Sequence, residues 1–289
     1  MLWLFLGAIS ISFAPIFVKA IDLGPTFIGA LRTGLASLFL IPVFYLVKKP
    51  AASTASPIPS SFWKYLLAAA LLFAGDLYVW HRSVIYAGAG ISTILGNTQV
   101  FYLSVLGILF LGEKLTLRFA IAVPMAFLGV FLLISYQGDL ASLPRFHEGV
   151  AYGVFTGMFY AGYISCLRKA ESLTQNFSAA QKLSMLCALC AVILLGISYL
   201  DAELKMPTPI DWVWLCLLAI TAQAIGWVLI STNLPKVPIS RAGLILLTQP
   251  TLAAVWGVLI YGETLSVIQV VGGALTLSGI YLGSTAKSS

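Results

Sequence analysis

Two ionisable residues, Arg32 and Asp76, lie inside apolar stretches that are long enough to cross a membrane. An ionisable group within a membrane span costs about 2.5 to 3.5 kcal/mol on insertion scales, which makes each one a candidate functional residue. At a helical rise of about 1.5 Å per residue, both fall roughly 10 Å from one edge of an apolar core about 30 Å thick. We therefore expect Arg32 and Asp76 either to pair across two helices or to share a polar pocket that binds a solute. The alternative is a purely structural ion pair.

Polar amides form a second group of candidates. Gln99 and Gln249 each fall near the middle of an apolar stretch. Amides can hydrogen-bond a polar solute without the insertion penalty of a charge, although Asn and Gln also join helices to one another in membranes. Because the group comes from three different stretches, we expect it to line a central cavity. Its other members are Asn97, Thr98, Gln223 and Thr248.

Aromatic rings and one histidine accompany these polar residues. Trp80 follows Asp76 by one helical turn, and Trp227 follows Gln223 by one turn. Such rings could stack on a flat or cationic solute, although aromatic side chains more often pack against helices or lipid. His81 could relay protons together with Asp76, or could simply be solvated at the membrane surface. The remaining aromatic candidates are Tyr102, Tyr160, Tyr163 and Trp256.

The elements that position these residues must be membrane-spanning helices. The chain has 289 residues, is 60% hydrophobic and 9% charged, and has a mean hydropathy of +0.99, which is more apolar surface than a soluble domain of this length can bury. The first stretch has no basic leader and no clear cleavage site, so we expect a retained helix rather than a signal peptide. The apolar stretches are 2–20, 25–47, 62–86, 88–111, 115–136, 149–166, 179–200, 210–231, 239–261 and 265–282. They predict an all-α integral membrane protein of about ten helices.

The positive charges are dispersed rather than gathered in a patch, so the net charge of +6 does not indicate nucleic-acid binding. Most Lys and Arg residues fall in alternate connectors, and the positive-inside rule then places both termini in the cytoplasm. The four cysteines lie in apolar stretches without further metal ligands, and we expect them to be buried thiols. In the sixth stretch, Gly153 and Gly157 form a GxxxG pair that should permit close helix packing.

An internal repeat divides the sequence. LGEKLT at 111–116 matches YGETLS at 261–266, an offset of 150 residues. Since five helices is an odd number, tandem copies of a five-helix unit must insert with opposite topology. We expect two inverted halves, 1–137 and 147–289, around a central cavity. The glutamates of the two turns, Glu113 and Glu263, suit the first turn of the following helix and should be structural. At the same offset, Thr98, Gln99, Gly107 and Gly129 match Thr248, Gln249, Gly257 and Gly279.

The doubled Gly-Glu-x-Leu-Ser/Thr turn resembles that of the EamA-type branch of the drug/metabolite transporter superfamily. ALRTGLA at 30–36 and GDLYVWHRSV at 75–84 resemble its second and third helices. The resemblance covers nearly the whole chain and implies ten helices, a central cavity, and alternating access for the export of amino acids, related metabolites or drugs. One departure is that Pro250 follows Gln249 in the second half, whereas Val100 takes this place in the first.

These observations predict a secondary transporter of a small polar or amphipathic metabolite in a lipid bilayer. A channel, or a lipid- or drug-moving protein without ion coupling, is the alternative. HExxH, GxSxG and paired Asp-rich motifs are absent from the sequence, so we do not expect an enzyme, a cofactor or a metal. Protons are candidate coupling ions, and the expected location is the bacterial inner membrane. The sequence leaves the substrate and the oligomeric state open.

Overall fold

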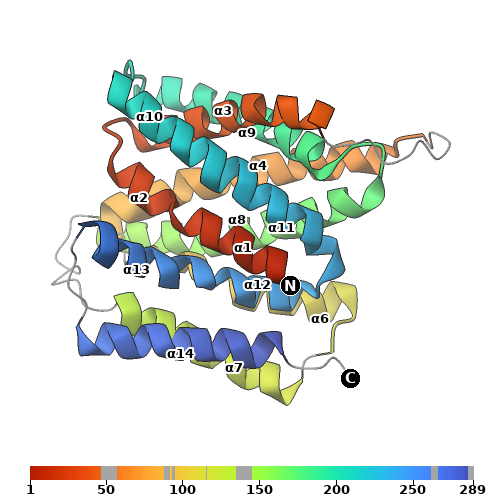
Figure 1. Ribbon diagram of the computed structural model, residues 1–289, viewed down its shortest axis with the longest axis vertical. Helices are drawn as coiled ribbons and strands as arrows, with labels where there is room; N and C mark the ends of the chain where they lie inside the picture. Colours follow the sequence, from red (N-terminus) through yellow and green to blue (C-terminus); the bar gives the residue numbers. More distant parts are fainter. Residues whose placement is uncertain are drawn as a thin grey trace. The chain divides into compact units, whose positions relative to one another are not determined.

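The computed structural model describes residues 1–46, 57–87, 92, 95–114, 116–134, 145–261 and 266–285, and its regular elements there are all helices (Figure 1). The helices of the first half are α1 (Leu2–Ser12), α2 (Ala14–Lys19), α3 (Pro25–Leu46), α4 (Ser60–Ala87), α6 (Gln99–Leu111) and α7 (Leu117–Ile134). Those of the second half are α8 (Phe146–Leu173), α9 (Ala179–Leu200), α10 (Pro209–Leu218), the π-helix η2 (Ala219–Gly226), α11 (Trp227–Asn233), the short 3₁₀ helix η3 (Leu234–Lys236), α12 (Ile239–Leu246), α13 (Thr248–Tyr261) and α14 (Val267–Ser284).

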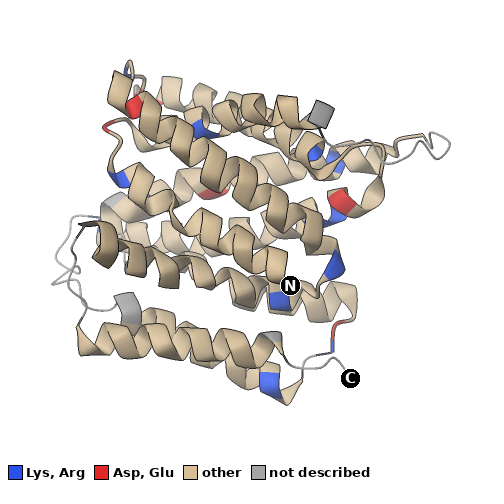
Figure 2. Ribbon diagram, in the orientation of Figure 1, with Lys and Arg blue, Asp and Glu red and all other residues tan. Residues whose placement is uncertain are grey.

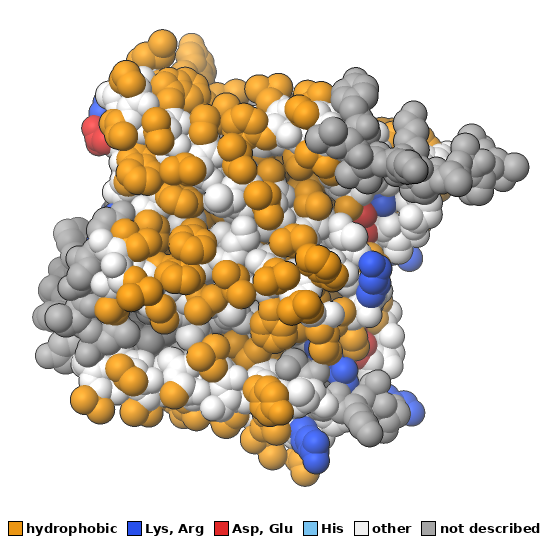
Figure 3. Space-filling model, in the orientation of Figure 1, with side chains coloured by type: hydrophobic (Ala, Val, Ile, Leu, Met, Phe, Trp, Pro, Cys, Tyr) orange, Lys and Arg blue, Asp and Glu red, His pale blue; other side chains and the backbone are white. Residues whose placement is uncertain are grey.

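Most of these helices are apolar and long. Seven helical segments are long and apolar enough to cross a membrane, and three shorter apolar helices accompany them in the described part of the chain. Figure 2 shows the charged residues mostly near helix ends, and Figure 3 shows hydrophobic side chains over the visible helix surfaces. Each apolar stretch predicted from the sequence overlaps one of these helices, which confirms the all-helical class. The three short helices, Leu95–Leu111, Leu117–Leu132 and Val267–Gly283, remain predictions as spans.

The chain forms two compact units, and each combines segments from both sequence halves. Unit 1 consists of residues 1–78 and 162–236, and unit 2 of residues 79–161 and 237–289. Because α4 and α8 continue from one unit into the other, residues on a single helix belong to different units.

In unit 1, α3 packs along α9, and α1 crosses the segment formed by η2 and α11. The crossing is close because both helices present glycine: a Cβ on Gly7 would lie 2.8 Å from the carbonyl oxygen of Gly226. At the start of α3, the Glu203 carboxylate accepts hydrogen bonds from the backbone N–H groups of Thr26 at 2.8 Å and Phe27 at 3.3 Å. These bonds satisfy N–H groups that have no partner within the helix.

The π-helix η2 interrupts the eighth apolar stretch at its middle. A π-helix accommodates an extra residue per turn, which changes the direction of the side chains around it, and such segments are frequent at functional sites. Here it carries the fully buried Gln223. The sequence offers no local signal for this segment, because its Ala-rich composition also suits an ordinary α-helix.

In unit 2, the repeat offset is reproduced by the packing of α7 against α14, which lie side by side in Figure 1. A Cβ on Gly129 of α7 would lie 2.6 Å from the Gly272 carbonyl oxygen and would also strike the backbone of Thr276. Conversely, a Cβ on Gly279 of α14 would lie 2.8 Å from the backbone nitrogen of Ala126 and 2.9 Å from the Ala122 carbonyl oxygen. The two sets of contacts are equivalent, because Gly272 and Thr276 lie 150 residues after Ala122 and Ala126. Since later residues of α7 face earlier residues of α14, the two helices run antiparallel.

The helices that carry the central glutamines are broken in both halves. Pro250 has no N–H to donate to the carbonyl of Leu246, and a break at Leu247 separates α12 from α13. In the first half, where Val100 replaces proline, a turn at Thr98 precedes α6, and the Thr98 hydroxyl donates to the carbonyl of Leu95. A break at this position therefore does not require proline.

The turn that revealed the repeat ends one helix and caps a distant one. Gly112 ends α6 with a φ of 64°, a left-handed conformation that glycine adopts without strain. The Glu113 carboxylate accepts hydrogen bonds from the backbone N–H groups of Ile239 at 2.6 Å and Ser240 at 3.2 Å, and from the Ser240 hydroxyl at 2.6 Å. Glu113 was expected to lie in the first turn of the helix that follows it in sequence. Its carboxylate instead caps the start of α12. Glu263, its repeat equivalent, lies outside the described residues.

We expect Glu113→Ala to lower the free energy of unfolding by about 1 to 2 kcal/mol, because the start of α12 loses its charged cap. Thermal unfolding of the purified protein in detergent measures the effect. Glu148→Ala is the matched control, since this glutamate is exposed and, among the described residues, forms an ion pair only with Arg145, three residues before it. Equal melting temperatures for the two variants would contradict the capping role.

Candidate functional site

The guanidinium of Arg32 is buried in unit 1 and bound by an amide. Its Nε and Nη2 atoms donate to the Gln223 Oε1 atom at 3.1 and 2.7 Å. The Gln223 Nε2 atom donates in turn to the Cys187 sulfur at 3.5 Å. Arg32 is only 7% exposed, and no hydrogen bond of its Nη1 atom is found among the described residues.

Asp76 is the second charged group of this cluster. It is 8% exposed, and its Oδ1 atom has no hydrogen-bond partner in the described part of the chain. Arg32 lies close enough to interact electrostatically with Asp76, but among the described residues no ion pair joins the two side chains. A buried carboxylate oxygen without a donor is costly and needs an explanation, which a bound ligand would provide.

Aromatic rings extend the cluster. The ring of Tyr163 on α8 stacks on Phe73 of α4 at a centroid distance of 4.5 Å, and Trp227 meets it edge-on at 4.8 Å. Phe73 and Trp227 are themselves 5.8 Å apart. Tyr163 also lies near Arg32, which places the aromatic and charged groups in one region of unit 1. The sequence did not single out Phe73, whose position in an apolar stretch is unremarkable.

The four cysteines are free thiols, and two of them belong to this region. Cys187 and Cys190 lie one turn apart on α9, are fully buried, and lie near Arg32. No group of three or more His, Cys, Asp or Glu residues suited to a metal ion occurs in the described ranges. Cys187 thus accepts a hydrogen bond in the cluster, a role that the sequence did not indicate.

The remaining candidate residues belong to unit 2. Gln99 is buried at the start of α6, and its Oε1 atom has no hydrogen-bond partner among the residues described there; the same is true of the Thr248 hydroxyl oxygen at the start of α13. Gln249 donates to the Tyr160 hydroxyl at 3.5 Å. Asn97, Tyr102 and Trp256 are half-buried.

Trp80 and His81 continue α4 beyond Asp76 and lie in unit 2. His81 is 5% exposed, so it is buried rather than solvated, and its ring lies against that of Trp80 at 5.0 Å. The GxxxG pair of α8 packs against the helix break of this unit: a Cβ on Gly153 would lie 2.8 Å from the Leu95 Cβ atom, and one on Gly157 would strike the Thr98 hydroxyl. Close packing by these glycines is therefore confirmed.

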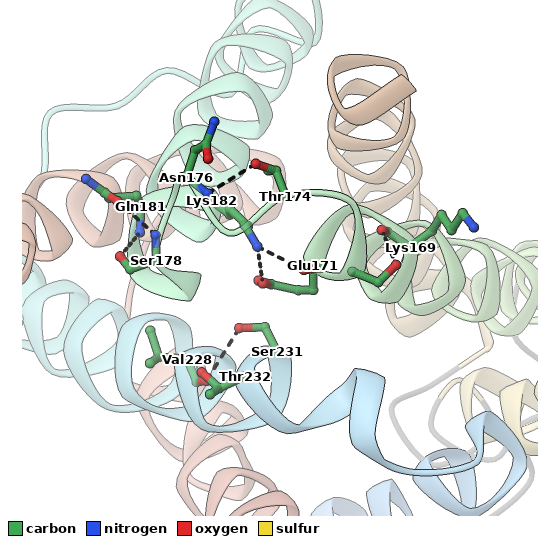
Figure 4. Close-up of polar contacts among 11 residues, drawn as sticks. Lys169, Glu171, Thr174, Asn176, Ser178, Gln181, Lys182, Val228, Ser231 and Thr232 are labelled. Carbon is green, nitrogen blue, oxygen red and sulfur yellow. Dashed lines mark hydrogen bonds and ion pairs between the residues drawn. The ribbon is translucent and has the colours of Figure 1, made fainter. Parts of the chain in front are cut away.

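A buried ion pair in unit 1 escaped the sequence analysis (Figure 4). The Lys182 Nζ atom donates to the Glu171 Oε2 atom at 2.9 Å and to the Glu171 carbonyl oxygen at 3.0 Å, and both side chains are almost fully buried. Lys182 lies in the first turn of α9. There Ser178 and Gln181 form a capping box. In the loop between α8 and α9, the ring of Phe177 packs on that of Phe62 at a centroid distance of 5.6 Å.

Breaking this pair should be strongly destabilising, because an unpaired charge would remain buried. We expect Lys182→Met to lower the free energy of unfolding by about 3 to 5 kcal/mol. The double variant Lys182→Met/Glu171→Gln removes both charges and should recover most of that loss, as measured by thermal unfolding in detergent. A double variant no more stable than Lys182→Met would show that the ion pair is not the cause.

Comparison with known proteins identifies the kind of protein to which this cluster belongs. The model of the EamA-like transporter family matches residues 1–135 and 147–285. A protein of Archaeoglobus fulgidus described as an uncharacterized transporter is 24% identical over 201 residues, which cover 70% of this chain and 68% of that protein. A protein of known crystal structure shares the fold with a TM-score of 0.82 at 13% identity, covering 98% of this chain and 96% of that one.

The resemblance noted in the sequence is thereby confirmed, in both of its halves. Guanidinium, carboxylate and aromatic groups in a buried cluster can bind a solute without covalent chemistry. Because the two matched stretches together cover nearly all of its residues, the chain belongs to the EamA-like transporter family and is an integral membrane transporter.

Proposed function

We propose that this protein is a secondary carrier that moves a small polar or amphipathic metabolite by alternating access, and that the solute binds at Arg32 and Asp76. The observation that carries the proposal is the buried Oδ1 atom of Asp76, which has no hydrogen-bond donor among the described residues. A cationic group of a solute would supply that donor. The Nη1 atom of Arg32 is available in the same way for an anionic group.

The solute that fits best carries a positive charge, a negative charge and an apolar or flat part. The rings of Phe73, Tyr163 and Trp227 would contact the apolar part or a cationic group. An amino acid or a related compound has these features. Export is the expected direction, which the family resemblance supports.

The antiparallel packing of α7 on α14 supports the proposed inverted repeat. Repeat-equivalent glycines, Gly129 and Gly279, occupy equivalent places in that contact. Two inverted five-helix halves would rock about a shared site, as in other transporters built from inverted repeats. The remaining polar candidates, including Gln99, Thr248 and Gln249, belong to unit 2 and stay candidates for solute binding there. Placement in a bacterial inner membrane, with both termini cytoplasmic, completes the proposal.

A thermal-shift screen of the purified protein tests which solutes bind. The panel contains zwitterionic amino acids, aromatic amines, carboxylates and neutral sugars. We expect zwitterionic or cationic compounds with an apolar part to raise the melting temperature in a saturable manner, because a ligand that binds only the folded state stabilises it. Stabilisation by neutral sugars alone would contradict the proposed charge recognition.

A further inference from the structure

Arg32 and Asp76 are buried near one another in unit 1, but among the described residues no ion pair joins them. Opposite unit charges 4 Å apart attract one another by about 4 kcal/mol even at an effective dielectric constant of 20. Arg32 and Asp76 would therefore form an ion pair unless another group held them apart. In the structure, two of the three guanidinium nitrogens of Arg32 are bound to Gln223 instead.

Gln223 is itself held at both ends of its amide. Its Oε1 atom accepts both hydrogen bonds from Arg32, and its Nε2 atom donates to Cys187. The residue is 0% exposed, and it lies in the π-helix η2, whose non-standard turn sets the direction of the side chain. An amide that is fully engaged in this way has few hydrogen-bonding positions left for a solute.

We infer that Gln223 is a positioning residue: it holds Arg32 away from Asp76 and so keeps both charges available to oppositely charged groups of one solute. This inference rests on the proposed binding site. Gln223 thus acts through Arg32 and need not contact the solute. The sequence had instead suggested that Gln223 binds the solute directly.

The first test needs no ligand. In wild type, Arg32→Met and Asp76→Asn should be only weakly coupled in their effects on the melting temperature, because no ion pair joins the two side chains. In a Gln223→Leu background Arg32 is released and pairs with Asp76, so the two substitutions should become coupled. We expect a coupling of about 4 °C or more in that background, and little in wild type. The same small coupling in both backgrounds would overturn the inference.

The second test uses phenethylamine as a cationic probe without a carboxylate, with binding followed by thermal shift. Gln223→Leu should weaken its binding about 10-fold or more, because Asp76 is then occupied by Arg32. Adding Arg32→Met frees Asp76 and should restore binding. Gln223→Glu retains an acceptor for Arg32 and should weaken the binding of this probe less than Gln223→Leu does. If the added Arg32→Met weakened binding further, Gln223 would be a packing residue only.

The two proposals fail in different ways. If wild type binds none of the charged solutes but the coupling appears in Gln223→Leu, the positioning role holds and the proposed function is wrong. If wild type binds solutes that Gln223→Leu binds equally well, and no coupling appears, the proposed function holds and the positioning role is wrong.

Discussion

Asp76→Asn should lower the initial rate of solute uptake into proteoliposomes by roughly 100-fold. The substitution keeps the size of the side chain but removes a charge-assisted hydrogen bond to the solute, which contributes about 1.5 to 3 kcal/mol. Stability should not fall, because the Oδ1 atom of Asp76 has no hydrogen-bond partner in the described structure and a neutral amide is cheaper to bury.

The matched control is Asp201→Asn, which makes the same chemical change at an exposed position after α9. This variant should transport at the wild-type rate. An Asp76→Asn protein that is folded and transports as well as Asp201→Asn would remove Asp76 from the binding site.

Gly129→Ala should destabilise the protein by about 3 kcal/mol or more, and Gly279→Ala should have a similar effect. In each case the added methyl group would meet backbone atoms of the facing helix, which cannot move aside as a flexible side chain can. Thermal unfolding in detergent, together with the yield of monodisperse protein, measures the loss.

Gly196→Ala provides the control for these two variants. Gly196 lies in α9, and a Cβ at this position would meet nothing within 4 Å. Because alanine favours helices over glycine by about 1 kcal/mol, this variant should be as stable as wild type or slightly more so. Similar losses at Gly129 and Gly279 would also support the equivalence of the two halves, whereas a loss at only one of them would argue against it.

Much of the fold follows from the sequence because membrane spans have a simple physical signature. An apolar run of about 20 residues must form a helix in lipid, where every backbone N–H and C=O group needs an internal partner. The repeat offset matched Gly129 with Gly279, and both residues lie in the contact between α7 and α14, which the sequence did not predict. The cap by Glu113 could not be anticipated, because its partners on α12 lie 126 and 127 residues further along the chain. Local sequence patterns do not report such distant contacts.

The site was predicted only in part, because depth in the membrane can be counted from the sequence whereas helix rotation cannot. Counting gave Arg32 and Asp76 similar depths, and the structure places them in one cluster of unit 1. Which side chain Arg32 contacts depends on how its helix faces η2, and the π-helical geometry there has no sequence signal. Gln223 was recognised as polar and central, but its bonds to Arg32 and Cys187 were visible only in the structure.

The proposal that the protein is a carrier with a saturable site is tested most directly by counterflow in proteoliposomes. Vesicles preloaded with an unlabelled solute from the thermal-shift screen are diluted into a trace of the same labelled solute. A carrier that works by alternating access should accumulate the label transiently, at a rate that saturates with solute concentration, and Asp76→Asn should abolish this accumulation. Label entry that is unaffected by preloading and rises linearly with concentration would indicate a channel and contradict the account.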